Sequence, residues 1–420
     1  MLHQFRNNEL IWKKLRCERY FKSFTSWATA FILLFSFQII LAQNTELRFR
    51  LYDFDDGLTH RNIFKIQQDE SGFIWIATIN GLNKFDGHEF THFTSDRQGG
   101  HIPNNFITDM MIDSDNQIWL GCGHDLVKMD ASTSVVNIIE QEVSNPNLGI
   151  DFHFYNLFKD QRGNLWTSAY QEQTGNVFIR KKAPDLPLKQ WQKLPGNYVQ
   201  RPINETPAGV WIGATENELW FSDNMSPFSL FKTFKHNHGE TNKARIIQTQ
   251  VTQDSSLWIL MSDGRVFSKK AGLHGFREHP ISQSVPSQDS VLSFLVEESG
   301  DIWMGGFSKL WHYDAFNNQT TNYNKDLEEI FEHTTSLRQI FKDNTGVLWV
   351  ATDFGALSIH RFQKLFTSYL SDGHEFCRDG TCSTRGLTED ENGNIYMSYY
   401  HSIHVLNPKT GDTRPLFRRN

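Results

Sequence analysis

The side chains that could do chemistry in this 420-residue chain are scattered instead of grouped. The triplet His236-Asn237-His238 could take part in metal-dependent cleavage, but such a site needs further ligands in a defined setting. The carboxylate pairs Asp55-Asp56 and Glu297-Glu298 could serve as general acid and base in glycoside cleavage, yet both fall in predicted turns, where solvation explains them. We therefore predict no catalytic residue, no metal site and no cofactor.

Tryptophans are the second chemical signal, because indole rings can stack on sugars. Here they follow a period: an apolar-Trp pair comes after an Asp- and Gly-containing turn, and consecutive pairs lie 44 to 47 residues apart. The positions that repeat are Trp75, Trp119, Trp166, Trp211, Trp258, Trp303, Trp349 and, with tyrosine in place of tryptophan, Tyr396. Such regularity indicates structural anchors buried between repeats and not a row of sugar-stacking residues.

Each repeat contains four short strands. In the first repeat the expected strands are 63–67, 73–78, 82–85 and 90–93, separated by turns at 69–72, at Asn80-Gly81 and at Asp86-Gly87. Four antiparallel strands in 40 to 50 residues are typical of a β-propeller blade. The sequence therefore predicts an all-β fold, a β-propeller of four-stranded antiparallel blades.

The first 43 residues are predicted to be a signal peptide, with an uncleaved N-terminal anchor as the alternative. Five basic residues between Lys13 and Lys22 precede an apolar run from Trp27 to Leu41 that ends at Ala42. This run is shorter than the roughly 20 residues that a membrane helix needs. The expected location is periplasmic or secreted, with membrane association only through the N-terminus or through further C-terminal parts of a longer sensor.

The charge of the remaining residues argues against binding to nucleic acid. Residues 1–43 hold six Lys/Arg and two Asp/Glu, which leaves 35 basic and 46 acidic residues in the rest of the chain. Nucleic-acid affinity depends on neutralising phosphates, so a domain this acidic is a poor candidate.

Cys377 and Cys382 lie close together in a Gly-containing segment, and outside the cytoplasm they could form a small-loop disulfide, with two free thiols as the alternative. Cys17 lies in the signal segment and Cys122 stands alone. A zinc site is not expected, since no second pair of ligands accompanies these cysteines.

The repeat resembles that of the two-component regulator propeller family. Residues 74–87 (IWIATINGLNKFDG) match its pattern nearly throughout, and residues 343–357 also fit it well. The repeats around Trp211 and Trp258 have lost the turn Asp or Gly. The resemblance extends from residue 45 to about residue 410.

This resemblance implies the periplasmic sensor region of a hybrid histidine kinase. Such regions carry two seven-bladed rings and a β-sandwich before a membrane span and the kinase domains, and the implied ligand is an oligosaccharide. None of the kinase motifs stands between residues 44 and 420, so no enzyme activity is expected of this chain. The implied partners are a second propeller and sensor kinase modules, with a homodimer as a further option.

Two domain divisions fit the repeat. In the favoured one, residues 44–364 form a seven-bladed propeller, completed by the strand Leu47–Tyr52 in the blade of Trp349, and residues 365–420 begin a second propeller. In the alternative, the repeat of Tyr396 is the eighth blade of a single ring. A closed ring removes exposed sheet edges in either case.

Propeller geometry confines a binding site to the loops before the first strand of a blade and after its Trp strand. The polar candidates in those loops are His60, Arg61, Asn80, Asn104, His124 and Asp353. Trp191, Trp220 and Trp311 lie outside the repeat anchor, and any of them exposed on that face would suit carbohydrate stacking. The sequence thus predicts a glycan-responsive sensor domain, with a glycan hydrolase or lyase and a non-catalytic scaffold as the alternatives.

Overall fold

The computed structural model describes residues 45–95, 101–141, 152–171, 176–182, 192–193, 202–213, 217–223, 227–235, 244–273, 275–286, 291–363, 385–398, 402–408, 410 and 412–418. The expected signal peptide, the His236–His238 triplet, Trp191 and the pair Cys377 and Cys382 lie outside these residues. The chain divides into two compact units, Leu47–Arg361 and a second made of Met1–Glu46 with Phe362–Asn420. Among the described residues no helix is both long and apolar enough to cross a membrane.

The described part of Leu47–Arg361 forms seven four-stranded antiparallel sheets. The first sheet is β2 (Ile63–Gln68), β3 (Ile74–Thr78), β4 (Gly81–Phe85) and β5 (Phe90–Phe93). The second is β6 (Ile107–Ile112), β7 (Gln117–Cys122), β8 (Asp125–Asp130) and β9 (Val136–Gln141). The third is β10 (Phe152–Lys159), β11 (Leu165–Gln171), β12 (Asn176–Lys182) and β13 (Gln192–Lys193). The fourth is β14 (Ile203–Thr206), β15 (Gly209–Gly213), β16 (Glu218–Ser222) and β17 (Ser229–Thr233).

The fifth sheet is β18 (Ile246–Val251), β19 (Leu257–Met261), β20 (Val266–Lys269) and β21 (Arg277–Glu278). The sixth is β22 (Val291–Val296), β23 (Ile302–Gly306), β24 (Leu310–Asp314) and β25 (Gln319–Asn322). The seventh is β26 (Leu337–Lys342), β27 (Leu348–Thr352), β28 (Ala356–Gln363) and β1 (Thr45–Tyr52). Two short helices, η1 (Pro280–Gln283) and α2 (Asn324–Ile330), follow the fifth and sixth sheets.

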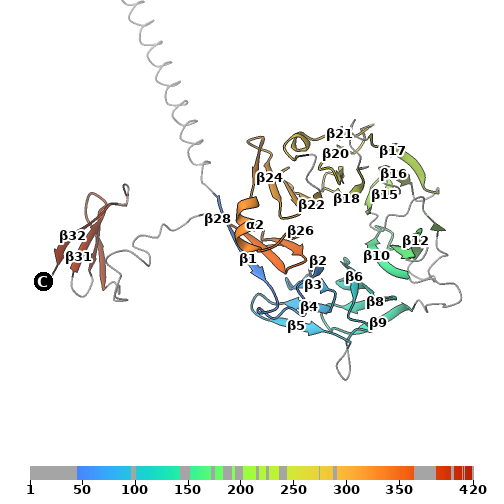
Figure 1. The fold of residues 1–420 in the computed structure, drawn as a ribbon, viewed down its shortest axis with the longest axis horizontal. Helices are drawn as coiled ribbons and strands as arrows, with labels where there is room; N and C mark the ends of the chain where they lie inside the picture. Colours follow the sequence, from blue (N-terminus) through green and yellow to red (C-terminus); the bar gives the residue numbers. More distant parts are fainter. Residues whose placement is uncertain are drawn as a thin grey trace, which may run out of the picture. The chain divides into compact units, whose positions relative to one another are not determined.

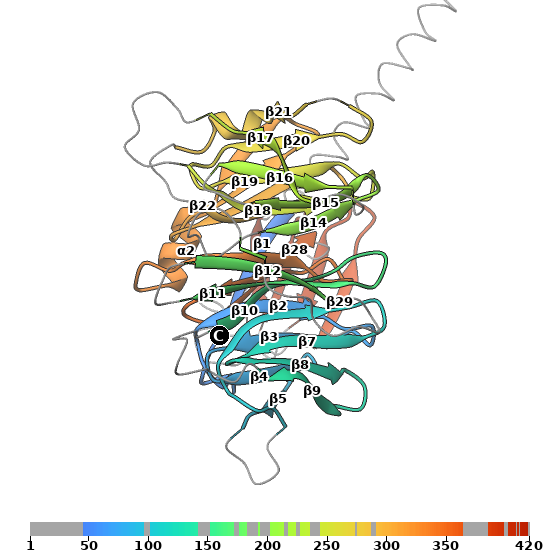
Figure 2. The same cartoon turned by 90° about the vertical axis from the view of Figure 1, so that its right-hand side faces the viewer.

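The sheets of this unit are arranged around an axis with their first strands innermost, as in a β-propeller (Figure 1). Each first strand contacts the first strand of the next sheet, from β2 through β6, β10, β14, β18 and β22 to β26, and β26 contacts β2. Figure 2 shows the same sheets edge-on. The predicted fold, a propeller of four-stranded antiparallel blades, is thereby confirmed.

Strand β1 joins the seventh sheet. β1 pairs with β28, which is one of the two pairings that the sequence leaves open. Tyr52 is buried there, its ring stacked on Trp349 with centroids 5.6 Å apart and edge-on to Phe85 of the first sheet at 5.1 Å. Ser358 donates a hydrogen bond to the Arg50 carbonyl and Gly355 lies against Tyr52, so the two strands are antiparallel and Leu47 and Arg361 lie at the same end.

A turn acid and a tryptophan form a repeating unit in five of the seven blades. In the first blade Asp69 Oδ1 accepts a hydrogen bond from the Phe73 backbone N–H, and Oδ2 accepts one from Trp75 Nε1 at 2.8 Å. Gly72 has a φ of 91°, a conformation that glycine adopts without strain. The same acid-to-indole bond joins Asp113 to Trp119, Asp160 to Trp166, Glu297 to Trp303 and Asp343 to Trp349.

The two repeats with degenerate turns depart from this pattern. Trp211 donates to the Thr206 hydroxyl, and the indole N–H of Trp258 is buried without a hydrogen-bond partner. Trp258 is half-buried, whereas the other six tryptophan anchors are buried. Without the turn acid, the indole of one anchor bonds to a hydroxyl and that of the other has no partner, although both anchors keep their place in the sheet.

Side-chain amides on the innermost strands connect one blade to the next. Gln339 of β26 bonds both to the N–H of Ile66 and to its carbonyl, across 273 residues of sequence. Gln248 and Gln250 of β18 bond in the same way to Phe294 and Val296 of β22. These amides satisfy backbone groups that the first strand cannot pair within its own sheet.

The second unit contains one described sheet, β29 (Gly386–Glu389), β30 (Ile395–Ser398), β31 (Ser402–Leu406) and β32 (Thr413–Arg418). Its turn repeats the blade pattern, since Asp390 accepts a hydrogen bond from the Tyr396 hydroxyl. Its first strand differs from those of the seven other sheets, because all four of its residues are exposed.

The packing at the closing sheet predicts that Tyr52→Ala destabilises the propeller by roughly 3 to 5 kcal/mol, through lost burial and an unfilled cavity between Trp349 and Phe85. Phe54→Ala is the matched control, because Phe54 is 71% exposed two residues further on, and its loss should change stability by no more than about 0.5 kcal/mol. Denaturant unfolding of both variants is the measurement. Equal stability of the two variants would contradict the role of β1 in closing the ring.

Candidate ligand-binding face

The six polar residues expected to contact a ligand lie at one end of the blade strands, and we call this face of the propeller the loop face. His60, Arg61 and Asn104 come before the first strand of a blade, while Asn80, His124 and Asp353 are in turns between the second and third strands. Because successive strands run antiparallel, these segments lie at the same end of the strands in every sheet. The acid-containing turns between the first and second strands lie at the opposite end, which we call the turn face.

His60, Arg61 and Asp353 come together where the seventh blade meets the first. The Arg61 guanidinium lies over the ring of Phe354 at 4.9 Å, so a cation of the first blade stacks on an aromatic ring of the seventh. In the reverse direction, the Arg338 guanidinium of β26 lies over the ring of Phe64 in β2 at 5.4 Å. We call these four residues, Arg61, Phe354, Arg338 and Phe64, the seam cluster.

Arg338 is partly engaged by neighbouring oxygens. It donates hydrogen bonds to the Asn62 side chain and to the Ile63 carbonyl, and its guanidinium lies 4.0 Å from Asp353 Oδ2. Asp353 in turn accepts hydrogen bonds from the N–H and hydroxyl of Ser336, at 3.0 and 2.6 Å. Burial lowers the pKa of Arg338 below its ordinary value, but an arginine remains protonated at neutral pH.

His60 is a neutral group at this seam. Burial, and secondarily the charge of Arg61, lowers its pKa below the usual histidine value. Its Nδ1 accepts a hydrogen bond from the Asn62 N–H at 2.9 Å, which places the proton of the neutral ring on Nε2. His60 therefore offers a donor and not a second positive charge.

The other three predicted residues lie towards the second blade. Asn80 reaches the Thr59 carbonyl only at 3.5 Å, and Asn104 Oδ1 accepts the Phe106 N–H at 2.8 Å, so the amide of Asn104 helps to shape its own loop. His124 lies in the β7–β8 turn beside Asp125. Burial raises the pKa of Asp125, and the smaller, opposite effect of His124 does not cancel the rise.

Cys122 is buried with its pKa raised to about 12 by burial, so its thiol is inert.

Sequence reasoning missed Arg338, Phe64 and Phe354. Phe64 and Arg338 occupy the same place in their repeats, five residues before the turn acid, where the first strand has a β-bulge. The same irregularity recurs in β6, β18 and β22. A bulge re-aims a side chain at the strand end, so the residue five before the turn acid is the sequence signal that could have identified these positions.

Of the three tryptophans outside the repeat anchor, the two that lie among the described residues do not form a stacking surface. Trp311 is buried in the core of the sixth blade, and Trp220 is half-buried with its indole donating to Glu218 at 3.2 Å. The aromatic groups at the seam are phenylalanines instead.

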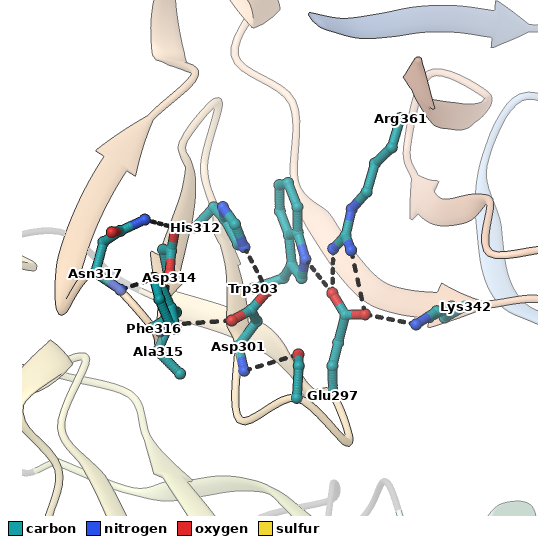
Figure 3. A network of polar contacts seen from close by, with 11 residues as sticks. Glu297, Asp301, Trp303, His312, Asp314, Ala315, Phe316, Asn317, Lys342 and Arg361 are labelled. Carbon is teal, nitrogen blue, oxygen red and sulfur yellow. Dashed lines mark hydrogen bonds and ion pairs between the residues drawn. The ribbon is translucent and has the colours of Figure 1, made fainter. Parts of the chain in front are cut away.

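A second polar network lies on the turn face, between the sixth and seventh blades (Figure 3). The Glu297 carboxylate accepts hydrogen bonds from Trp303, from Lys342 at 2.6 Å and from Arg361. The Trp303 indole is stacked on His312 with ring centroids 4.2 Å apart, and Arg361 lies 5.3 Å from the indole ring. This network joins the sixth blade to β28, the last strand of the unit.

Glu297, Asp301 and His312 offer ligand atoms within 4.8 Å of one another, which is close enough to share a metal ion. Two cations already neutralise Glu297, and a third would be repelled by them. Burial alone would raise the pKa of Glu297, but the bonds from Lys342 and Arg361 outweigh it, and the pKa lies below its ordinary value. The arrangement therefore fits a structural ion-pair network better than a metal site.

Comparison with known proteins supports the same class of fold. Residues 101–124 match the family model described as two component regulator propeller, so the chain carries this repeat. A stretch of 61 residues, 14% of the chain, is 44% identical to histidine kinase P4 of Formosa agariphila and covers 4% of that protein.

Two solved extracellular domains of putative hybrid two-component systems from B. thetaiotaomicron, BT4673 and BT3049, superpose with TM-scores of 0.55 and 0.51 at 17% and 18% identity. Each comparison covers 89% of this chain, which spans about half of those domains, 47% and 49%. Streptogramin B lyase superposes with a TM-score of 0.55 at 13% identity, covering 75% of this chain and 98% of the lyase. At these identities the likeness is one of fold.

The turn-face network predicts that Glu297→Gln lowers stability at neutral pH by roughly 1 to 3 kcal/mol, a range kept small because Lys342 and Arg361 are 39% and 30% exposed and can be hydrated. Because the pKa of Glu297 is lower in the folded than in the unfolded protein, the wild-type advantage is complete above about pH 4.5 and disappears as the pH falls through the folded-state value. Thermal melts of both proteins between pH 3 and 7 measure it.

The control is Glu298→Gln, which changes the exposed neighbouring carboxylate and should leave the melting temperature nearly unchanged. If the two variants melt together at pH 7, Glu297 does not stabilise the contact between the blades.

Proposed function

We propose that Leu47–Arg361 is the ligand-sensing propeller of an extracytoplasmic two-component sensor and that it responds to a glycan. The observation that carries the proposal is the seam cluster, which presents cationic and aromatic groups on the loop face. Among the residues that the structure describes, the carboxylate in direct contact with the cluster is that of Asp353, which is held by Ser336 and lies beside Arg338. Such a surface binds a ligand and provides no matched acid and base to cleave it.

The similarity to extracellular domains of hybrid two-component systems supports this reading. A sensor outside the cytoplasm requires export, which residues 1–43 would supply as a signal peptide or anchor. It also requires an output, for which the partners are a second propeller and kinase modules. The chain itself is proposed to be non-catalytic.

We further propose that Leu47–Arg361 is a seven-bladed ring and that residues 365–420 begin a second propeller. The pairing of β1 with β28 supports the first part, because it completes the seventh sheet without the repeat of Tyr396. The second part is supported by Leu387 of β29, which pairs with the residue after the anchor, as Ile66 does in the first blade. Leu387 is 67% exposed, whereas Ile66 is 0% exposed.

The same position is buried in the other blades that share this register, at Met110, Ile203, Thr249, Phe294 and Ile340. A blade whose inner apolar position faces water has the surface on which a neighbouring blade packs. An inner face of this kind is what the first blade of a further ring would present, and it supports the proposal that residues 365–420 begin a second propeller.

A glycan lyase or hydrolase is the second candidate: the fold of streptogramin B lyase shows only that a similar scaffold can carry an enzyme, and one residue of the loop face favours this reading. Asp125 has a raised pKa because of burial, the direction expected of a catalytic acid, and it follows His124. Asp125 is therefore the carboxylate on which the enzymatic reading is best tested.

We expect the protein to bind an oligosaccharide from a panel of plant, algal and host glycans without converting it. Isothermal titration calorimetry measures the binding, and chromatography of the same mixtures after prolonged incubation measures turnover. Products that disappear in the Asp125→Asn variant would replace the sensor with an enzyme. If neither binding nor turnover is detected, the scaffold is the reading that remains.

A further inference from the structure

We propose that the seam cluster binds an acidic group, a carboxylate or a sulfate ester, on the carbohydrate ligand. This inference rests on the proposed sensor function and specifies the chemistry that its binding face selects. It is carried by the two guanidinium groups at the junction of the seventh and first blades.

The first step is a comparison of this junction with the others on the loop face. Where the first blade meets the second and the sixth meets the seventh, the loop entering the blade is held to the preceding turn by a backbone hydrogen bond, from the Gly81 N–H to the Asn105 carbonyl and from the Ser308 N–H to the Thr335 carbonyl, both 2.7 Å. At the corresponding place the loop of the first blade meets the turn of the seventh through Arg61 stacked on Phe354. Closing a junction does not require arginine, so its presence here calls for another explanation.

The second step is the donor capacity of these side chains. Stacking engages the flat face of a guanidinium and leaves the N–H groups of its edge in the plane of the group, although part of the Arg338 edge already bonds to Asn62 and to the Ile63 carbonyl. Arg61 is an exposed residue, and the side chain of Arg338 is 30% exposed, so water or a ligand can reach both. Planar donors of this kind bind carboxylate and sulfate oxygens through paired, charge-assisted hydrogen bonds.

The third step concerns the charges around the cluster. The carboxylate that faces it, Asp353, balances only one of the two arginines. Lys65 of the first blade lies 3.7 Å from Asp109 of the second blade, which neutralises its charge. On the neighbouring loop Asp56 pairs with Arg50 at 3.6 Å. His60 is neutral and adds no charge, so the surplus at the seam is the one positive charge that Asp353 leaves unbalanced, in a chain whose net charge is −7.

The fourth step is the apolar surface that accompanies these cations. The ring of Phe64 meets that of Phe106 edge-on at 6.1 Å, and His333 meets Phe354 at 6.0 Å. Phe307, in the sixth-blade turn, is 46% exposed and forms a β-bridge with Ser336, two residues before Arg338. Cations set among partly exposed rings suit a ligand with apolar C–H faces and an attached anion, as in an acidic sugar.

The experiment compares probes that differ in charge alone. Oligogalacturonides are titrated beside the same oligosaccharides after methyl esterification, and sulfated galactan oligosaccharides beside their desulfated forms. We expect one charged probe to bind at least about tenfold more tightly than its neutral partner, and this advantage to shrink as salt rises from 0.05 to 0.5 M. The two pairs distinguish a carboxylate from a sulfate.

The key variant is Arg61→Gln, which is exposed and should leave the melting temperature unchanged. It should weaken the charged probe at least about tenfold, Arg61→Lys should give an intermediate loss, and neither should affect the neutral probe. Arg162→Gln removes an exposed charge from the turn face and is the matched control. Arg338→Gln is a second test, read together with its melting temperature because Arg338 also contacts Asn62.

The outcomes separate the two proposals. If neutral and charged probes bind equally, or if Arg61→Gln binds the charged probe as well as the wild type does, the acidic-ligand inference is wrong while the sensor proposal stands. If none of the four probes binds and none in the wider panel does, both fail.

Discussion

The bond between the turn acid and the indole six residues later is the interaction on which the rest of the molecule depends. One carboxylate oxygen fixes the turn through backbone N–H groups, and the other fixes the tryptophan that fills the space between blades. In two blades the same carboxylate also receives a lysine from the next blade, Lys159 at Asp113 and Lys342 at Glu297. One carboxylate thus organises a turn, the core beside it and, in these two blades, the contact with the next blade. Its burial is tolerated because both of its oxygens accept hydrogen bonds.

The sequence predicted the features that recur and failed on those that occur once. Strands, turns and anchors repeat every 44 to 47 residues, so an error in one repeat is corrected by the others. The two hydrogen bonds between Gln339 and Ile66 and the stacking of Arg338 on Phe64 join residues more than 270 positions apart, and no local pattern encodes such a pairing. Propeller topology predicted that the six candidate residues lie on the loop face. The contacts that gather His60, Arg61 and Asp353 could not be predicted, because they form only when the seventh blade meets the first.

The two faces of the propeller carry different kinds of polar chemistry. On the turn face, the turn acids are buried and hydrogen-bonded, and Glu297 is also paired with Lys342 and Arg361. On the loop face, Arg61 and Arg338 are stacked on rings and keep part of their surface in water. Because the turn face meets the structural demands of the repeat, residues on the loop face can vary without loss of the fold.

The antiparallel pairing of β1 with β28 leaves Leu47 and Arg361 side by side at the same end of the closing sheet. A tension that draws those two ends apart would load the hydrogen bonds between β1 and β28 one after another, beginning at the end held by Arg361 and Glu297. Strands peeled in this way resist far less force than strands sheared along their length. The ring would then open at its closing sheet, and because the Arg361–Glu297 pair holds β28 to the sixth blade, β1 is the strand that separates.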